Sequence, residues 1–120
     1  MKVAISAEGS TPDSRVDTRF GRAKYFVIAD TETGDFKAVD NEQTLNVPQG
    51  AGIQSAQTVA QSGASAVISG HVGPKAFRAL NAAGIDVLLA SDMTVAQALD
   101  KFSRGELEKV SAPDVEGHWI

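Results

Sequence analysis

Residues 66–84, AVISGHVGPKAFRALNAAG, join a short apolar run to a helical pattern through a glycine-rich turn. The run at 66–68 is bounded by polar and glycine residues, which is typical of a parallel strand buried on both faces. Apolar residues then recur with the helical period at positions 76, 77, 80 and 83. Pro74 suits the first turn of a helix, and Gly84 suits a left-handed C-cap. This stretch predicts a strand followed by a helix in an α/β protein.

The same two patterns alternate on either side of this unit. Apolar runs at 3–5 and 87–89 predict two more central strands, and runs at 25–29 and 36–39 flank a polar turn and predict an antiparallel hairpin. Two further helices are predicted, with apolar stripes at Ile53, Ala56, Val59 and Ala60 and at Val95, Ala98, Leu99 and Phe102. Right-handed crossovers then give a three-layer α/β/α sandwich around a five-stranded mixed sheet. We expect one domain over residues 1–120, with an irregular tail over 106–120.

Composition excludes several classes of protein. The chain has 120 residues, 42% of them hydrophobic, which is enough for one core without metal or disulfide cross-links. It has no cysteine, so disulfides, thiolate catalysis, zinc fingers and thiolate-ligated iron–sulfur clusters are excluded. The net charge of −4 argues against a nucleic-acid-binding surface, and no apolar stretch is long enough to span a membrane. We therefore expect a cytoplasmic monomer that binds neither nucleic acid nor membranes.

Ligands of such sheets gather beyond the carboxyl ends of the parallel strands, and the connection after the first strand is unusually long there. Within this connection Arg19 and Arg22 flank Phe20 and Gly21. Two planar guanidinium groups next to a glycine backbone can bind an anion. The alternative is that the arginines pair with nearby acidic residues, Glu8, Asp13 or Asp17, and only brace the loop.

Two glycine-rich turns lead into predicted helices at this edge. The first contains Gly70, His71, Gly73 and Lys75; backbone N–H groups at such a helix start attract anions, and a lysine there favours a negative ligand. Its glycines are three apart, so it is not a Walker P-loop. His71 is a candidate metal ligand, with a purely structural role as the alternative. The second turn contains Gly50 and Gly52 within a connection, residues 43–52, that can close over the edge; the alternative is that its glycines only mark a loop.

Catalytic patterns are missing from the predicted strands and turns. The central runs at 2–6 and 66–69 contain no carboxylates, so a two-metal nuclease of ribonuclease H type is not expected. The nucleophile-elbow pattern of serine hydrolases is also absent. The sequence therefore offers no evidence for either of these two kinds of hydrolytic enzyme.

Three segments together carry a resemblance that covers almost the whole chain. They are VDTRFGRAKYF at 16–26, GAG at 50–52 and GHVGPKAF at 70–77. In this order and spacing they resemble the nitrogenase iron–molybdenum cofactor-binding family. The segments VAISAEG at 3–9 and VEGHW at 115–119 resemble a branch of that family whose members carry a molybdenum–copper sulfide cluster. The resemblance implies a ribonuclease H-like fold and a role in holding or handing over a metal–sulfide cluster without catalysis.

The resemblance also implies what the candidate residues do. A preassembled metal sulfide is bulky and anionic, and a host without cysteine can hold it through N–H groups, cationic side chains and an apolar wall. Met93 can add a soft thioether contact. The expected cargo is a molybdenum–copper sulfide cluster, with an iron–molybdenum–sulfur cluster as the alternative, and other cluster-handling proteins are possible partners. The rival interpretation is an enzyme or sensor that binds a nucleotide or a phosphorylated metabolite at the same edge. The candidate cofactor-binding residues are Arg19, Phe20, Gly21, Arg22, Gly50, Gly52, Gly70, His71, Gly73, Lys75 and Met93.

Overall fold

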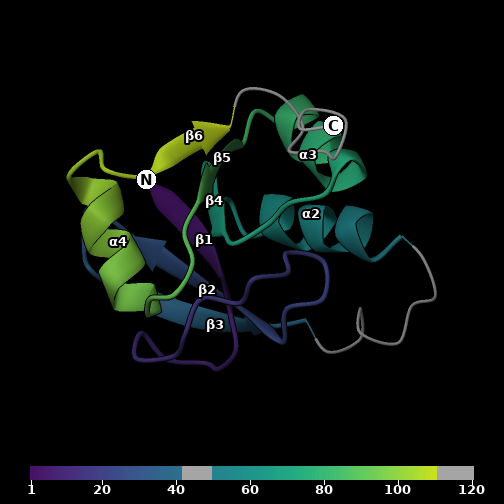
Figure 1. The fold of residues 1–120 in the computed structure, drawn as a ribbon. Coiled ribbons are helices and arrows are strands. Elements are labelled where there is room, and N and C mark those ends of the chain that lie inside the picture. Colours follow the sequence, from purple (N-terminus) through teal and green to yellow (C-terminus); the bar gives the residue numbers. More distant parts are fainter. Residues whose placement is uncertain (42–49, 111–120) are drawn as a thin grey trace.

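The computed structural model describes residues 1–41 and 50–110 as one mixed sheet with three helices (Figure 1). The apolar runs form strands and the amphipathic stripes form helices, as the two periodicities predict. The strands are β1 (Lys2–Ala7), β2 (Tyr25–Asp30), β3 (Phe36–Asp40), β4 (Ala66–Ser69), β5 (Asp86–Leu89) and β6 (Glu108–Val110), and the helices are α2 (Ala51–Gln61), α3 (Pro74–Ala82) and α4 (Val95–Ser103).

The strand order is β3-β2-β1-β4-β5-β6. The pairs β1–β4 and β4–β5 are parallel, and β1–β2 and β2–β3 are antiparallel, as expected for the mixed ribonuclease H-like sheet. The sheet has six strands, so the expected number of five was wrong. The additional strand β6 pairs antiparallel with β5 and lies inside the segment predicted to be an irregular tail. Its three residues show no alternation of apolar and polar side chains. Their extended backbone is fixed by pairing with the edge of β5 and not by a buried face.

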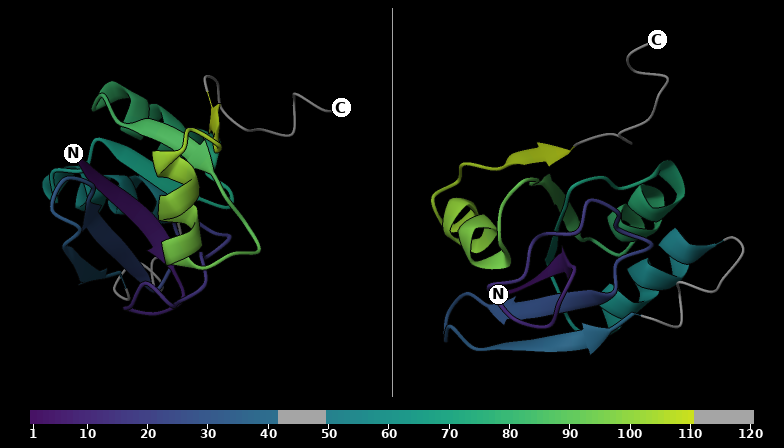
Figure 2. Two further views of the ribbon diagram at one scale, coloured as in Figure 1. Left: turned by 90° about the vertical axis from the view of Figure 1, so that its left-hand side faces the viewer. Right: turned by 60° about the horizontal axis from the view of Figure 1, so that its bottom comes forward.

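The helices cover both faces of the sheet, which confirms the three-layer sandwich (Figure 2). On one face, residues of α2 and α3 pack with Ala4, Phe26 and Val67. On the other, α4 packs with Val3, Ile5 and neighbouring residues. All four residues predicted to form the apolar stripe of α4 pack in this second core.

The expected buried face of α2 was wrong at two positions. Ile53 is 39% exposed and Ala60 is exposed, whereas the hydroxyl-bearing Ser55 is fully buried. The Ser55 hydroxyl donates to the Gly21 carbonyl at 3.3 Å and lies 3.2 Å from the Asn41 amide nitrogen. A satisfied hydroxyl can occupy a core position, so the helix is rotated from the orientation that hydrophobicity alone predicts.

No helix within residues 1–41 and 50–110 is long and apolar enough to cross a membrane. The predicted closure by residues 43–52 falls mainly outside the described residues, as does the C-terminal motif at 115–119.

Candidate functional site

The connection from β1 to β2, residues 8–24, runs across the carboxyl ends of the parallel strands (Figure 1). Its first half is bonded to the turn before α4: the Val16 N–H donates to the Met93 carbonyl at 2.9 Å, and the Val95 N–H donates to the Ser14 carbonyl at 2.8 Å. Its second half is bonded to the turn before α3, where the Phe20 N–H donates to the His71 carbonyl at 3.1 Å. The connection is therefore fixed to both neighbouring turns.

Three buried polar residues lie where this connection crosses β1 and β4. The Ser6 and Ser69 hydroxyls are 2.8 Å apart and both side chains are fully buried. The Ser6 hydroxyl also donates to the Asp17 carbonyl at 2.8 Å, and the Asp17 N–H donates to the Ser6 carbonyl at 2.8 Å. Bonds between groups that have lost contact with water fix the chain closely, since breaking them leaves an unsatisfied polar atom.

Arg19 is paired with Asp17, as the alternative interpretation of the loop predicted. The Asp17 Oδ1 accepts from the Arg19 N–H at 2.9 Å and from Arg19 Nε at 3.4 Å. The side chain of Asp17 is 5% exposed, whereas that of Arg19 is 66% exposed. The pair therefore lies at the surface of the protein, with the Asp17 carboxylate buried and the Arg19 guanidinium largely exposed to water.

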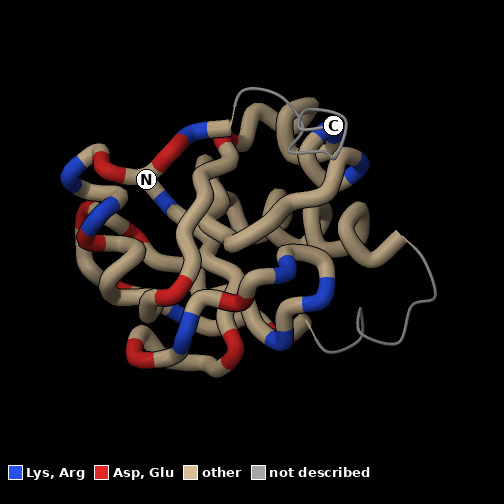
Figure 3. The backbone as a smooth tube through the Cα atoms, viewed as in Figure 1, with Lys and Arg blue, Asp and Glu red and all other residues tan. Residues whose placement is uncertain are grey.

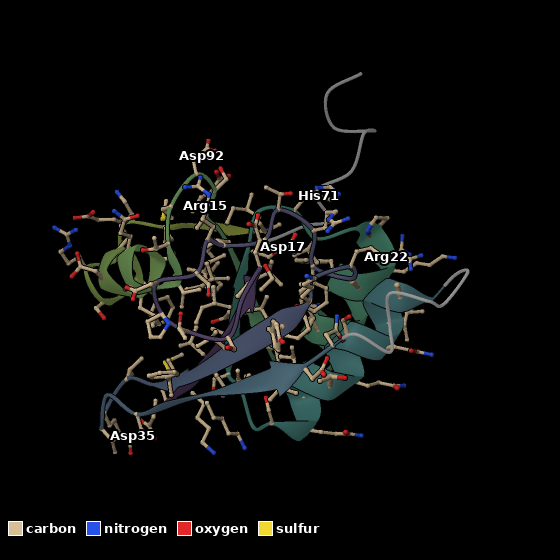
Figure 4. The ribbon with its side chains drawn as sticks, turned by 90° about the horizontal axis from the view of Figure 1, so that it is seen from below. Arg15, Asp17, Arg22, Asp35, His71 and Asp92 are labelled. Atoms are coloured by element: carbon tan, nitrogen blue, oxygen red, sulfur yellow. The ribbon has the colours of Figure 1, made fainter. Side chains whose placement is uncertain are left out.

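Residues 18–24, which we call the cationic segment, contain Arg19, Arg22 and Lys24 and no acidic residue. In Figure 3 this part of the β1–β2 connection shows Lys and Arg alone, whereas the side of the molecule around α4 mixes both signs of charge. Figure 4 places Arg22 and His71 along the same side of the molecule as Asp17, Arg15 and Asp92. The protein as a whole is acidic, so this segment is a local departure from its net charge of −4.

Phe20 lies between the two arginines in sequence but belongs to the core. It is 2% exposed, and its ring packs against Phe26 with centroids 5.2 Å apart. Its ring is therefore an anchor that holds the cationic segment onto the α2–α3 face of the sheet.

The N-terminus of α3 is open. Its N-cap, Gly73, makes no side-chain capping bond, its first turn contains no acidic residue, and Lys75 in that turn is exposed. A Cβ at Gly73 would meet nothing within 4 Å. Among the described residues, the N–H groups of Lys75 and Ala76 make no hydrogen bond within the protein. This is the arrangement of N–H donors and positive helix dipole that binds anions.

The candidate glycines divide into two groups by their surroundings. A Cβ at Gly70 would lie 2.7 Å from the Thr18 Cα, one at Gly21 would lie 2.9 Å from the Gly52 backbone nitrogen, and one at Gly52 would lie 3.0 Å from the Ala76 Cβ. These three glycines allow close packing of the chain. Gly50 resembles Gly73, because nothing lies within 4 Å of its Cβ position, and its φ of +81° also requires glycine.

Met93 lies in the turn before α4, apart from the turn before α3. It lines a hollow of about 390 Å³ together with residues of α4 and its preceding turn: Asp92, Gln97, Asp100, Lys101 and Arg104. The N-terminus of α4 is closed, because Thr94 and Gln97 form a reciprocal capping box and the N–H groups of Val95 and Ala96 donate to carbonyls of the β1–β2 connection. The N–H groups of this first turn are therefore bonded within the described part of the protein, unlike those of Lys75 and Ala76 at α3.

A second hollow, of about 280 Å³, lies at the other end of the sheet beside the β2–β3 turn, where Figure 4 shows Asp35. Asp30 lines it, and the pKa of this carboxyl is lowered, chiefly because the Glu32 N–H donates to it at 2.9 Å. The nearby α-amino group of Met1, 3.9 Å away, acts in the same direction. These contacts belong to the turn itself, and the hollow contains none of the candidate residues.

No group of three or more His, Asp or Glu side chains arranged to hold a metal ion occurs within the described ranges. His71 is exposed and belongs to no such group among the described residues. The chemistry available at this edge is cationic side chains, backbone N–H donors and one imidazole. The buried network of Ser6, Ser69 and Asp17 was not predicted from the sequence. The signal that could have indicated it is the serine that follows each of two buried apolar runs, at 3–5 and 66–68.

Comparison with known proteins concerns the chain as a whole. Residues 1–105 match the family described as dinitrogenase iron-molybdenum cofactor. The chain is similar to the apo form of the orange protein from Desulfovibrio gigas, with a TM-score of 0.93, 43% identity and coverage of 95% of this chain and 96% of that one. It is also similar to a NifB-like protein from Thermotoga, with a TM-score of 0.84, 39% identity and coverage of 97% and 98%. An uncharacterized protein of Methanocaldococcus jannaschii is 32% identical over 111 residues, 91% of each chain.

The chain therefore belongs to the dinitrogenase iron-molybdenum cofactor family, as the sequence motifs indicated. Membership supports a cofactor-binding or carrier role.

Proposed function

We propose that this protein is a non-catalytic carrier of an anionic molybdenum-containing metal–sulfide cluster, specifically a molybdenum–copper sulfide. The proposed site lies between the cationic segment and the N-terminus of α3. The observation that carries the proposal is that an acid-free basic segment is hydrogen-bonded directly to the turn before an uncapped helix, in a protein that is otherwise acidic. Both features favour an anion at the same edge of the sheet.

The available donors fit a preassembled sulfide cluster better than a single metal ion. Cluster sulfides accept hydrogen bonds, and the described chain supplies the N–H groups of Lys75 and Ala76 together with the guanidinium of Arg19. No cysteine is present to displace sulfide from the metals. In this proposal the cluster is held by charge and hydrogen bonds. Arg22, His71 and Lys75 lie beside it, and Gly50 and Gly73, which have no side chains, leave space for it.

His71 has one of two roles in this proposal. As a neutral imidazole it ligates a metal of the cluster; as an imidazolium it donates a hydrogen bond to sulfide. The two roles give opposite pH dependences. Loading that weakens on acidification in the wild type but not in His71→Ala supports ligation, and loading that strengthens on acidification supports donation.

The carrier role is tested by loading the purified protein with tetrathiomolybdate and copper(I), followed by gel filtration, visible absorption and metal analysis. We expect both metals to co-elute with the wild type, and molar salt to weaken loading because exposed charges are screened within about 8 Å at physiological ionic strength. The double variant Arg19→Gln/Lys75→Gln should load poorly. The matched control Lys101→Gln/Lys109→Gln removes two exposed charges on the α4 and β6 side and should load normally.

Loading of the wild type that is unchanged by salt and by the Arg19→Gln/Lys75→Gln substitutions would overturn the proposal. ATP and inorganic phosphate serve as competitors in the same assay. Tight binding of either one, without metal loading, would support the rival nucleotide or phosphometabolite site instead.

A further inference from the structure

Asp17 is a buried acidic residue in a site that we propose binds an anion. It immediately precedes the cationic segment, and its carboxylate is 5% exposed. A negative charge at this place repels an anionic cargo, and burying a carboxylate costs free energy unless it is paired. A residue that is costly on both counts requires an explanation in the contacts that it makes.

The main chain of Asp17 is fixed by both neighbouring strands. Its N–H donates to the Ser6 carbonyl, and its carbonyl accepts from the Ser6 hydroxyl at 2.8 Å and from the Gly70 N–H at 3.4 Å. The Ser6 hydroxyl in turn contacts that of Ser69 at 2.8 Å. The Asp17 carboxylate therefore extends from a backbone that is tied to the ends of β1 and β4.

That carboxylate is bonded to Arg19 and to no other cation within the described chain. One oxygen, Oδ1, accepts both from the Arg19 backbone at 2.9 Å and from its Nε at 3.4 Å. A guanidinium held through Nε keeps the four N–H bonds of its two terminal nitrogens for other acceptors. The side chain of Arg19 is nevertheless 66% exposed, so it is held at one atom while its charged end remains accessible.

We propose that Asp17 is a positioning residue of the carrier site: it orders Arg19 before the cargo arrives, with the terminal nitrogens directed to the anion. This inference rests on the proposed function. An exposed arginine that is disordered in the empty protein must lose side-chain freedom when it binds, at a cost of roughly 0.5–1.5 kcal/mol, which corresponds to roughly a two- to tenfold loss in affinity. Asp17 removes that cost, and the inference requires this gain to exceed the repulsion between its carboxylate and the anionic cargo.

The two effects of Asp17 have opposite signs, so one variant separates them. Asp17→Asn keeps an oxygen that accepts from the Arg19 N–H and removes the charge that holds Nε. The inference predicts roughly two- to tenfold weaker loading of tetrathiomolybdate and copper(I). If repulsion is the dominant effect, the variant loads more tightly, and equal or tighter loading overturns the inference.

Combining substitutions at Asp17 and Arg19 shows whether Asp17 positions Arg19 or only supports the loop. In an Arg19→Gln background, the added Asp17→Asn substitution should cause no further loss of loading, because the residue that it positions is gone. A role in holding the loop alone would weaken loading in both backgrounds and overturn the inference. The Arg19 Nε–H resonance in nitrogen-15 NMR spectra should be slow to exchange in the wild type and fast in Asp17→Asn.

Arg19→Lys keeps the test decisive if Asp17→Asn does not fold. Arg19 is mostly exposed, so this variant is expected to fold, and it keeps the charge while losing the planar fork. Loading close to that of Arg19→Gln supports the inference, and loading equal to the wild type overturns it. If Arg19→Gln/Lys75→Gln itself loads normally, the proposed function fails; if it loads poorly while Asp17→Asn loads tightly, only the role of Asp17 fails.

Discussion

The N-termini of α3 and α4 both follow parallel strands at the same edge of the sheet, yet their hydrogen bonding differs. At α4 the capping box of Thr94 and Gln97 and the carbonyls of Pro12 and Ser14 satisfy the N–H groups of the first turn. At α3 the N-cap is Gly73 and the first turn has no such partners. Equivalent places in one sheet therefore differ: the α4 terminus is closed by hydrogen bonds, and the α3 terminus, where we propose that cargo binds, is not.

The largest expected effect concerns how closely the β1–β2 connection approaches the turn before α3. Gly70→Ala places a Cβ 2.7 Å from the Thr18 Cα, which is backbone and cannot rotate away. Overpacking of this kind costs about 1–3 kcal/mol, and we expect the upper end of that range in urea-induced unfolding. Gly73→Ala is the matched control. Its Cβ meets nothing, and the changes in chain entropy and N-cap preference oppose each other, so its effect should stay within about 0.5 kcal/mol.

The capped helix should lose stability without losing cargo. Thr94→Ala removes the oxygen that accepts from the Gln97 N–H at 3.2 Å, and loss of such an N-cap costs about 1 kcal/mol. Urea unfolding measures this loss, and metal loading should match that of the wild type. Impaired loading in a folded Thr94→Ala protein would mean that the two helix ends are not functionally distinct.

Converting the α3 terminus into one like that of α4 should separate stability from binding. Gly73→Asp adds both a capping oxygen and a negative charge. We therefore expect its free energy of unfolding to rise by roughly a few tenths of a kcal/mol and its cluster loading to weaken. Gly73→Ser adds the cap alone and should load better than Gly73→Asp. The comparison fails if Gly73→Asp loads as well as the wild type.

The smallest effect is expected for the exposed ion pair beside α4. Arg15 Nη2 and Asp92 Oδ1 are 3.9 Å apart, with the two side chains 57% and 95% exposed. Asp92 has a φ of +58°, a conformation that asparagine also tolerates. Asp92→Asn should therefore change stability by less than about 0.5 kcal/mol, at low and at high salt, in thermal unfolding. A larger, salt-dependent loss would show that charge contributes to this end of the sheet as well.

Periodicity was sufficient to predict the layers and the candidate edge, because buried strands and amphipathic helices leave regular patterns. Periodicity failed where pairing with a neighbouring strand, or hydrogen bonding of a buried polar side chain, determined the structure. Strand β6 has exposed Glu108 and Lys109 and no alternation, and only the edge of β5 explains it. Buried Ser55 and exposed Ile53 reverse what hydrophobicity predicts for α2.

The candidate glycines could not be distinguished from one another in the sequence, because a pattern of glycines does not reveal what each one contacts. Gly21, Gly52 and Gly70 have close neighbours at their Cβ positions, whereas Gly50 and Gly73 have none. The cationic segment was identifiable from its residues alone. The buried partner of Arg19 was one of three acids named as alternatives, and only the tertiary structure selects Asp17.

The two edges of the described sheet bear on how the protein behaves at high concentration. A strand with one unpaired side can recruit another chain, and edge strands that carry charges or are very short resist this. The edge strand β6 has three residues, including Glu108 and Lys109, and the opposite edge strand, β3, carries Lys37 and Asp40. A neighbouring molecule would have to desolvate these charges to extend the sheet, so both edges discourage aggregation.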